Sequence, residues 1–183
     1  GDPGPALLGW QSAQYAFTRY KTGDRPTGAR VLLTSAVAAI SPALAEAAAG
    51  SVYLAVRDGL DMVLIEACRP RSTMFTPRLD VGSRAPLANS ALGRAYLWAL
   101  PAQDRHQLIE SLRLARGSDW DSLEPGLLSA LRRADRCGYT LSAGEFHREI
   151  NSVSVPLIGP DGEIMALNCG TSTFAYTQDH LTQ

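Results

Sequence analysis

Two runs of alternating side chains near the C-terminal end constrain the fold of this chain more than any other feature. The runs cover residues 152–158 and 163–168, and a Pro-Asp-Gly turn signal lies between them at 160–162. Successive side chains of a strand point to opposite faces, so a hairpin here sorts its residues into two sets. We therefore expect an antiparallel sheet that contains this hairpin.

The pairing register of the hairpin decides which side chains share a face. Two registers that differ by one residue are plausible, and such a slip exchanges the faces of a strand. Pairing Leu157 with Glu163 separates polar from apolar side chains better. The apolar side chains then share one face: Val153, Val155, Met165 and Leu167. The small polar side chains share the other: Ser152, Ser154 and Asn168.

The polar face of this hairpin has two interpretations. A few polar groups among apolar neighbours can form the floor of a small-molecule pocket, where they orient a ligand. Antiparallel sheets also commonly expose one face to water, and these side chains would then be solvated. Periodicity alone leaves both interpretations open.

The rest of the chain alternates between helical and strand patterns. Further strands are predicted at 51–57, 62–65, 73–76 and 139–142. Helices are predicted at 5–20, 31–49, 91–97, 103–116 and 121–136. Within the second of these, Ser41-Pro42 either starts a new helix or kinks a single one. Thr177 is a candidate cap for a last helix. The order predicts an α+β domain with a largely antiparallel sheet flanked by helices.

A turn-rich segment at 21–28 is the best boundary in the chain. We expect residues 1–28 to form a linker or dimerisation helix with its connecting loop, and residues 29–183 to form one compact domain. The first helix carries apolar side chains that a small domain would not leave bare: Leu7, Leu8, Trp10 and Phe17. Self-association is therefore expected.

Composition excludes several classes of function. The net charge of −1, from 17 basic and 18 acidic residues, is unlike that of a surface that grips phosphates, so this chain should bind DNA poorly by itself. Three widely spaced cysteines suit free thiols in the cytoplasm. No apolar run approaches the roughly 20 residues that cross a membrane. The start at Gly1 lacks signal-peptide features and suggests a piece of a longer protein.

Catalytic and metal patterns are weak. The histidines and cysteines lack metal-ligand spacing, and no motif for a cofactor is found. A small enzyme that uses Cys169 or a histidine on a carboxylate substrate is the alternative to a binding domain. A lone cysteine in a strand is more often a small buried hydrophobe.

The helix predicted at 91–97 offers a possible anion site at its start. Its first backbone N–H groups, at Ala91, Leu92 and Gly93, have no partners within the helix and carry partial positive charge. A carboxylate could bind there. Alternatively, Ser90 or Asn89 caps these groups and nothing else binds.

Four segments of this chain resemble, in order and spacing, the effector domain of the isocitrate lyase regulator (IclR) family of bacterial transcription regulators. They read VYLAVRDG at 52–59, DVGSRAPLANSALGRA at 80–95, RCGYTLSAGE at 136–145, and INSVSVP at 150–156 with ALN at 166–168. The start, GPALLG at 4–9, resembles the linker helix of these regulators.

The resemblance implies a GAF-like domain that dimerises or tetramerises and signals to a winged helix-turn-helix, expected upstream of this chain. It also implies a site for a small carboxylate effector, such as an aromatic or dicarboxylic catabolite, with control of catabolic genes as the outcome. The family's ligand positions correspond to the backbone amides of Ala91 and Leu92 and to Ser142, Ser152, Asn168 and Gly170. The chain departs from family habit at Asn151, where members often carry Arg, and at Gly170, where others carry Ser.

Overall fold

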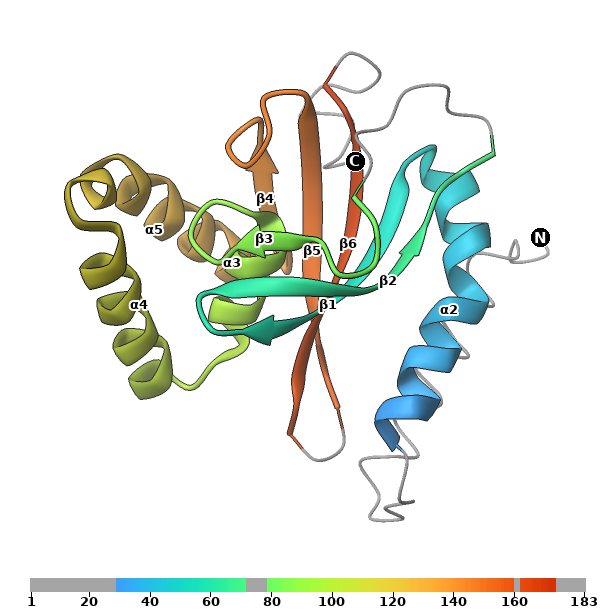
Figure 1. Cartoon of the computed structure of the whole chain (residues 1–183), viewed down its shortest axis with the longest axis horizontal. Helices are drawn as coiled ribbons and strands as arrows, with labels where there is room; N and C mark the ends of the chain where they lie inside the picture. Colours follow the sequence, from blue (N-terminus) through green and yellow to red (C-terminus); the bar gives the residue numbers. More distant parts are fainter. Residues whose placement is uncertain (1–28, 72–78, 160–161, 174–183) are drawn as a thin grey trace.

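An antiparallel sheet forms the centre of the molecule in the computed structural model, which describes residues 29–71, 79–159 and 162–173 (Figure 1). Within these residues the strands are β1 Ser51–Asp58, β2 Asp61–Cys68, β3 Arg84–Pro86, β4 Thr140–Ala143, β5 Ile150–Ile158 and β6 Ile164–Ser172. Their order across the sheet is β3-β2-β1-β6-β5-β4. The first and last of these described strands, β1 and β6, are thus neighbours at the centre, and every pairing among them is antiparallel.

Helices cover both faces of this sheet. They are α2 Ala29–Ala48, α3 Ala91–Ala99, α4 Ala102–Arg116 and α5 Trp120–Cys137, with a short 3₁₀ turn, Gly117–Asp119, between the last two. Figure 1 shows α2 along one side of the sheet and α4 with α5 at the opposite end of the molecule. The predicted α+β class is confirmed. The elements predicted at 5–20, at 73–76 and after Thr177 lie outside the described residues. None of the helices in the described ranges is long and apolar enough to cross a membrane.

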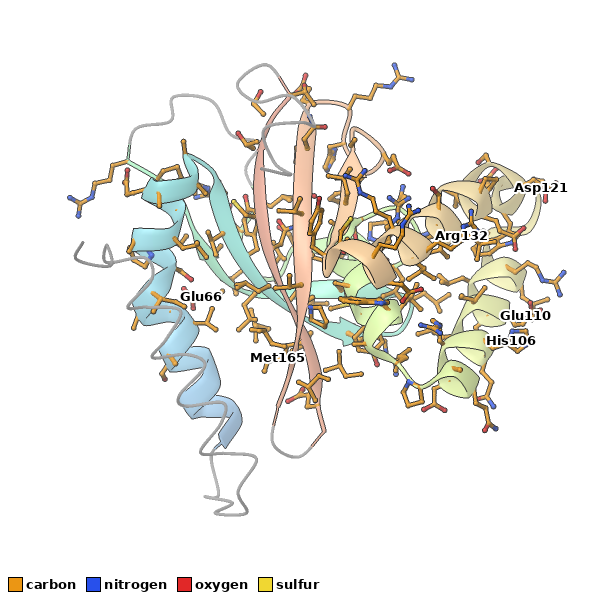
Figure 2. The ribbon with its side chains drawn as sticks, turned by 180° about the vertical axis from the view of Figure 1, so that it is seen from behind. Glu66, His106, Glu110, Asp121, Arg132 and Met165 are labelled. Atoms are coloured by element: carbon orange, nitrogen blue, oxygen red, sulfur yellow. The ribbon has the colours of Figure 1, made fainter. Side chains whose placement is uncertain are left out.

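The two faces of the sheet pack into separate cores. Against α2, Val37 contacts the buried side chains of Leu54 and Met165. The other face carries Tyr53, which belongs to a larger core that α3, α4 and α5 help to build. Figure 2 shows Glu66 beside α2, on the side of the molecule away from α4 and α5. Alternation along the strands therefore gives each face its own helical cover.

The predicted hairpin register is wrong by two residues. Leu157 pairs with Met165 rather than with Glu163, and Ile158 pairs with Ile164. A 2.6 Å hydrogen bond from the Gly159 N–H to the Glu163 carbonyl closes the end of the hairpin, which shifts the turn along the chain. A shift of two residues leaves each side chain on its original face. The predicted separation of polar and apolar faces is therefore confirmed.

Two other expectations needed correction. Residues 29–48 form one helix that continues through Pro42, so a second helix starting at Ser41 is wrong. The Ser41 hydroxyl does not cap a helix but donates to the Val37 carbonyl one turn earlier (2.7 Å). The sequence also gave no sign of β3, because three residues, Arg84–Pro86, are too few to show a period.

The start of α3 lies very close to the segment that precedes it. Ser90 is the N-cap residue, as predicted, and its hydroxyl accepts a hydrogen bond from the Gly93 N–H (3.0 Å). A methyl group on Gly93 would lie only 2.5 Å from the Leu87 carbonyl oxygen. Only glycine allows this approach of helix and backbone.

Replacing Gly93 with Ala should therefore destabilise the fold by about 3 kcal/mol, at the upper end of the usual range for overpacking a core. Urea unfolding of the variant measures this. The matched control is Gly59→Asn, because Gly59 has a φ of 63° with nothing within 4 Å of an added Cβ, and Asn tolerates that conformation. Equal stability of Gly93→Ala and the parent chain would contradict the close approach.

Candidate functional site

Two rows of small and polar residues cross the sheet on the face that α3 covers. The first polar row runs across four strands, from β4 through β5 and β6 to β1: Ser142, Ser152, Gly170 and Ser51. The second polar row lies one rung further along the same strands: Thr140, Ser154, Asn168 and Tyr53. Three of the predicted side-chain positions, Ser142, Ser152 and Gly170, are therefore direct cross-strand neighbours.

These rows are not a solvated surface. Ser142, Ser154 and Asn168 are at most 5% exposed, and Ser51 is completely buried. Ser152 is partly buried. The interpretation as a face open to water is therefore wrong, and each buried polar atom needs a hydrogen-bond partner.

Two hydroxyls of β4 hold the chain where it enters α3. Ser142 donates to the Asn89 carbonyl (2.7 Å), and Thr140 donates to the Ala91 carbonyl (2.8 Å). These bonds place the start of α3 above the β4 end of the two polar rows. Ser142 was predicted to contact a ligand, but its hydroxyl proton is already donated to the backbone that forms the site.

Asn168 also contributes to the frame. Its side-chain nitrogen donates to the Val153 carbonyl (3.0 Å) and to the Ser154 hydroxyl (2.8 Å). Its side-chain oxygen Oδ1 lies 3.4 Å from the place a Cβ would take on Gly170. The oxygen is therefore the atom of Asn168 that faces the first polar row.

The first turn of α3 leaves two backbone donors for another partner. Ser90 caps the Gly93 N–H, so the predicted capping alternative is confirmed for that group. The Ala91 and Leu92 N–H groups precede the first intrahelical bond and have no acceptor within the helix. Both residues are buried, which strengthens the electrostatic field at this helix start.

A buried arginine with an exposed carboxylate partner, not foreseen from the sequence, fixes the surroundings of the site. The Arg94 guanidinium is 1% exposed and donates to the carbonyls of Ala88 (3.1 Å) and Leu141 (2.7 Å) and to both carboxylate oxygens of Glu145. Asn89 adds a bond from its side-chain nitrogen to the Glu145 carbonyl (3.1 Å). The sequence alone did not indicate the burial of Arg94, because that burial depends on elements about 50 positions away.

Burial raises the pKa of Tyr53, whereas the Ser51 hydroxyl, which lies beside the Tyr53 hydroxyl at the β1 end of the first polar row, acts to lower that pKa. By contrast, the buried oxygen Oδ1 of Asn89, in the segment bonded to Ser142, has no hydrogen-bond partner among the described residues. Buried polar atoms of this kind are uncommon in folded proteins and point to a missing partner.

The alternative site around Cys169 is not assembled. Cys169 pairs with Val153 on the opposite face of the sheet, and burial raises the pKa of its thiol to about 11. Figure 2 shows His106 on α4, at the end of the molecule far from α2. His147 is exposed in the loop after β4. In the described ranges no group of three or more His, Cys, Asp or Glu residues could hold a metal ion.

A cavity of about 540 Å³ lies elsewhere, beside α2 and the end of β2. Its lining comes from Pro42, Ala43, Glu46, Arg69 and Arg71. None of the predicted site residues lines it, so it is a separate feature, although Arg69 also reaches toward β1.

Comparison with known proteins identifies a family for this chain. Residues 30–183 match the family model described as bacterial transcriptional regulator IclR C-terminal. The HTH-type transcriptional regulator TsaQ1/TsaQ2 of Comamonas testosteroni is 35% identical over 109 residues, which cover 59% of this chain and 39% of that protein. This chain therefore spans well under two thirds of the curated relatives it matches.

Solved structures agree with this match. A crystal structure of an IclR family transcriptional regulator from Brucella abortus is 32% identical, with a TM-score of 0.76, and the match covers 94% of this chain and 62% of that one. A double mutant of the PobR inducer-binding domain from Acinetobacter, in complex with 3-hydroxybenzoic acid, shares the fold at 19% identity and a TM-score of 0.64, covering 80% of this chain and 87% of that one.

Removing the Arg94 guanidinium should lower the free energy of unfolding more than removing a surface charge does. Arg94→Met leaves the buried carbonyls of Ala88 and Leu141 without their donor, and each buried polar group left unsatisfied costs about 1–3 kcal/mol. Denaturant unfolding measures this. The control is Arg113→Met, which breaks an exposed pair with Glu110 on α4 and should change stability little. A similar loss of stability in both variants would contradict the structural role of the Arg94 hydrogen bonds.

The thiols should differ in reactivity in the folded chain. With a pKa of about 11, the Cys169 thiol is ionised in about one molecule in a thousand at pH 8, whereas Cys137 is exposed. Iodoacetamide at pH 8 should therefore alkylate Cys137 first and Cys169 last, and urea should abolish the difference. Mass spectrometry of the peptides shows the order of alkylation. Rapid alkylation of Cys169 in the folded chain would support the alternative in which this thiol is a nucleophile.

Proposed function

This chain belongs to the IclR family of bacterial transcriptional regulators as their C-terminal effector-binding domain, and we propose that it senses a small carboxylate to control transcription of catabolic genes. The relatives that it matches are transcriptional regulators rather than enzymes. Its α+β architecture is the GAF-like fold of the IclR C-terminal domain.

The observation that carries the proposal is the first polar row beneath the start of α3. We assign the effector carboxylate to the backbone N–H groups of Ala91 and Leu92, which are donors without intrahelical acceptors. Ser152 and the side-chain oxygen of Asn168 orient the rest of the effector. Gly170 lies next to both, since a Cβ on it would be 3.5 Å from the Ser152 Cβ and 3.4 Å from the Asn168 side-chain oxygen.

The effector class follows from the donors at hand. Amide N–H groups at a helix start favour a carboxylate, and the apolar residues of the surrounding core favour a carbon skeleton beside it. A domain of the same fold, PobR, binds 3-hydroxybenzoic acid. An aromatic or dicarboxylic acid is the class that we propose for this chain.

Signal output requires partners beyond this chain. We propose that the effector domain works as a homodimer or homotetramer in the cytoplasm and reaches DNA through a winged helix-turn-helix upstream of residue 1. The formal charge of −1 supports this division of labour, because strong phosphate binding needs an excess of basic residues.

A screen of small carboxylic acids tests the effector class. An acid that binds only the folded chain raises its melting temperature by mass action, by the equivalent of about 2.7 kcal/mol at a hundred times its Kd. Benzoate, hydroxybenzoates and aliphatic mono- and diacids are the probes. If none of them raises the melting temperature, the carboxylate proposal is wrong.

The Ser152→Ala variant then tests the site. Losing one hydrogen bond to the uncharged part of the effector should weaken binding about two- to tenfold in calorimetry. The fold should persist, since only one oxygen atom is removed. Ser111→Ala is the matched control, because Ser111 lies on α4 and its hydroxyl bonds only to its own helix. If Ser152→Ala and the parent chain bind with equal affinity, Ser152 does not contact the effector and the proposed position of the site is wrong.

A further inference from the structure

We propose that Glu145, in the loop after β4, and Gly126, in α5, are positioning residues for the effector site. Neither contacts the effector; both act on the start of α3, where the N–H groups of Ala91 and Leu92 receive the carboxylate. This inference rests on the proposed function above. It extends that site to a loop and a helix that the predicted ligand positions do not include.

Glu145 holds the start of α3 at two points. Its carboxylate accepts two hydrogen bonds from the Arg94 guanidinium, and the bond from Nη1 to Oε1 measures 2.7 Å. Its backbone carbonyl accepts a third from the side-chain nitrogen of Asn89 (3.1 Å). Asn89 directly precedes the N-cap residue Ser90, and Arg94 follows that residue by about one turn, so the two points bracket the first turn of α3.

The loop that carries Glu145 is itself fixed by backbone hydrogen bonds. The Gly144 N–H donates to the Ile150 carbonyl (3.0 Å), and the Ile150 N–H donates to the His147 carbonyl (2.9 Å). Gly144 has a φ of 67°, which suits glycine, so the chain turns at the residue before Glu145. The loop can therefore hold a helix in place.

Gly126 leaves room for this pair. A Cβ at position 126 would lie 2.8 Å from Oε2 of Glu145 and 3.2 Å from Nη2 of Arg94, both closer than ordinary contact. Glycine is the poorest helix former after proline, yet it lies in the interior of α5. The contact with the ion pair gives a physical reason for a glycine at this position.

Substitution of Gly126 should separate positioning from stability. An added methyl group must displace the Glu145 carboxylate, which is the free end of a side chain that is 39% exposed. Such partly exposed ion pairs contribute little to stability, and alanine favours the helical conformation of α5. The Arg94 side chain is only 2% exposed, so a shift of its partner should be passed to the start of α3.

Calorimetry with 3-hydroxybenzoate, one of the acids of the screen, tests this inference. Gly126→Ala should weaken binding about two- to thirtyfold, while its midpoint of urea unfolding stays equal to that of the parent chain or rises. The matched control is Ser129→Ala, because Ser129 is an exposed residue of α5 and its replacement adds no atom. The affinity of this control should equal that of the parent chain.

A double variant tests whether Gly126 acts through Glu145. Glu145→Ala should weaken binding, and adding Gly126→Ala should then cause no further loss, because the methyl group no longer meets a carboxylate. Full additivity of the two losses would overturn the inference. So would a loss of affinity in Gly126→Ala that comes only with a lower urea midpoint. Glu145→Gln keeps the size of the side chain and should weaken binding even if Gly126→Ala fails to fold.

Amide hydrogen exchange separates this inference from the proposed function, because it needs no effector. The N–H groups of Gly93 and Arg94 both bond to Ser90, so their exchange rates report on the first turn of α3. Both rates should rise severalfold in Gly126→Ala and stay unchanged in Ser129→Ala. Unchanged rates in Gly126→Ala would overturn the inference even if 3-hydroxybenzoate binds. Raised rates in a chain that binds no acid would remove the proposed function and leave the link from α5 to α3 standing.

Discussion

The buried guanidinium of Arg94 is the contact on which the arrangement of the site depends. Arg94 lies on α3, and its bonds reach the loop before that helix, the carbonyl of Leu141 in β4 and the carboxylate of Glu145. A buried charge is tolerated only when all of its donors find partners, so these segments can adopt only one relative position. The start of α3 is thereby held above the β4 end of the polar rows.

Pairing between the first and last strands builds the floor beneath that helix. β1 and β6 are separated by more than a hundred residues, yet they lie side by side at the centre of the sheet. This pairing brings Ser51 into line with Gly170 and Tyr53 into line with Asn168. The β5–β6 hairpin alone would give a polar face only two strands wide. Because β6 also pairs with β1, the polar row extends across four strands.

The sequence predicted what depends on local periodicity and little of what depends on distant pairing. The hairpin faces, the helix after Ser90 and the α+β order all follow from patterns within about ten residues. The burial of Arg94 and the position of Ser51 do not, because each depends on strands or loops far along the chain. Local patterns also gave no sign that the side-chain nitrogen of Asn168 is used for hydrogen bonds within the sheet.

The two departures from family habit now have different meanings. Asn151 pairs with Thr171 and alternates with Ser152, so its side chain belongs to the opposite face of the sheet and does not enter the polar rows. Gly170 lies within the first polar row, between Ser152 and Ser51. A serine there would place its Cβ at ordinary contact distance from Asn168 Oδ1 (3.4 Å) and the Ser152 Cβ (3.5 Å), and it would add a hydroxyl to the row. The bonds of Arg94 fix the start of α3 over the β4 end of the rows, and the residue at position 170 sets how much side-chain volume lies in the middle of the first polar row.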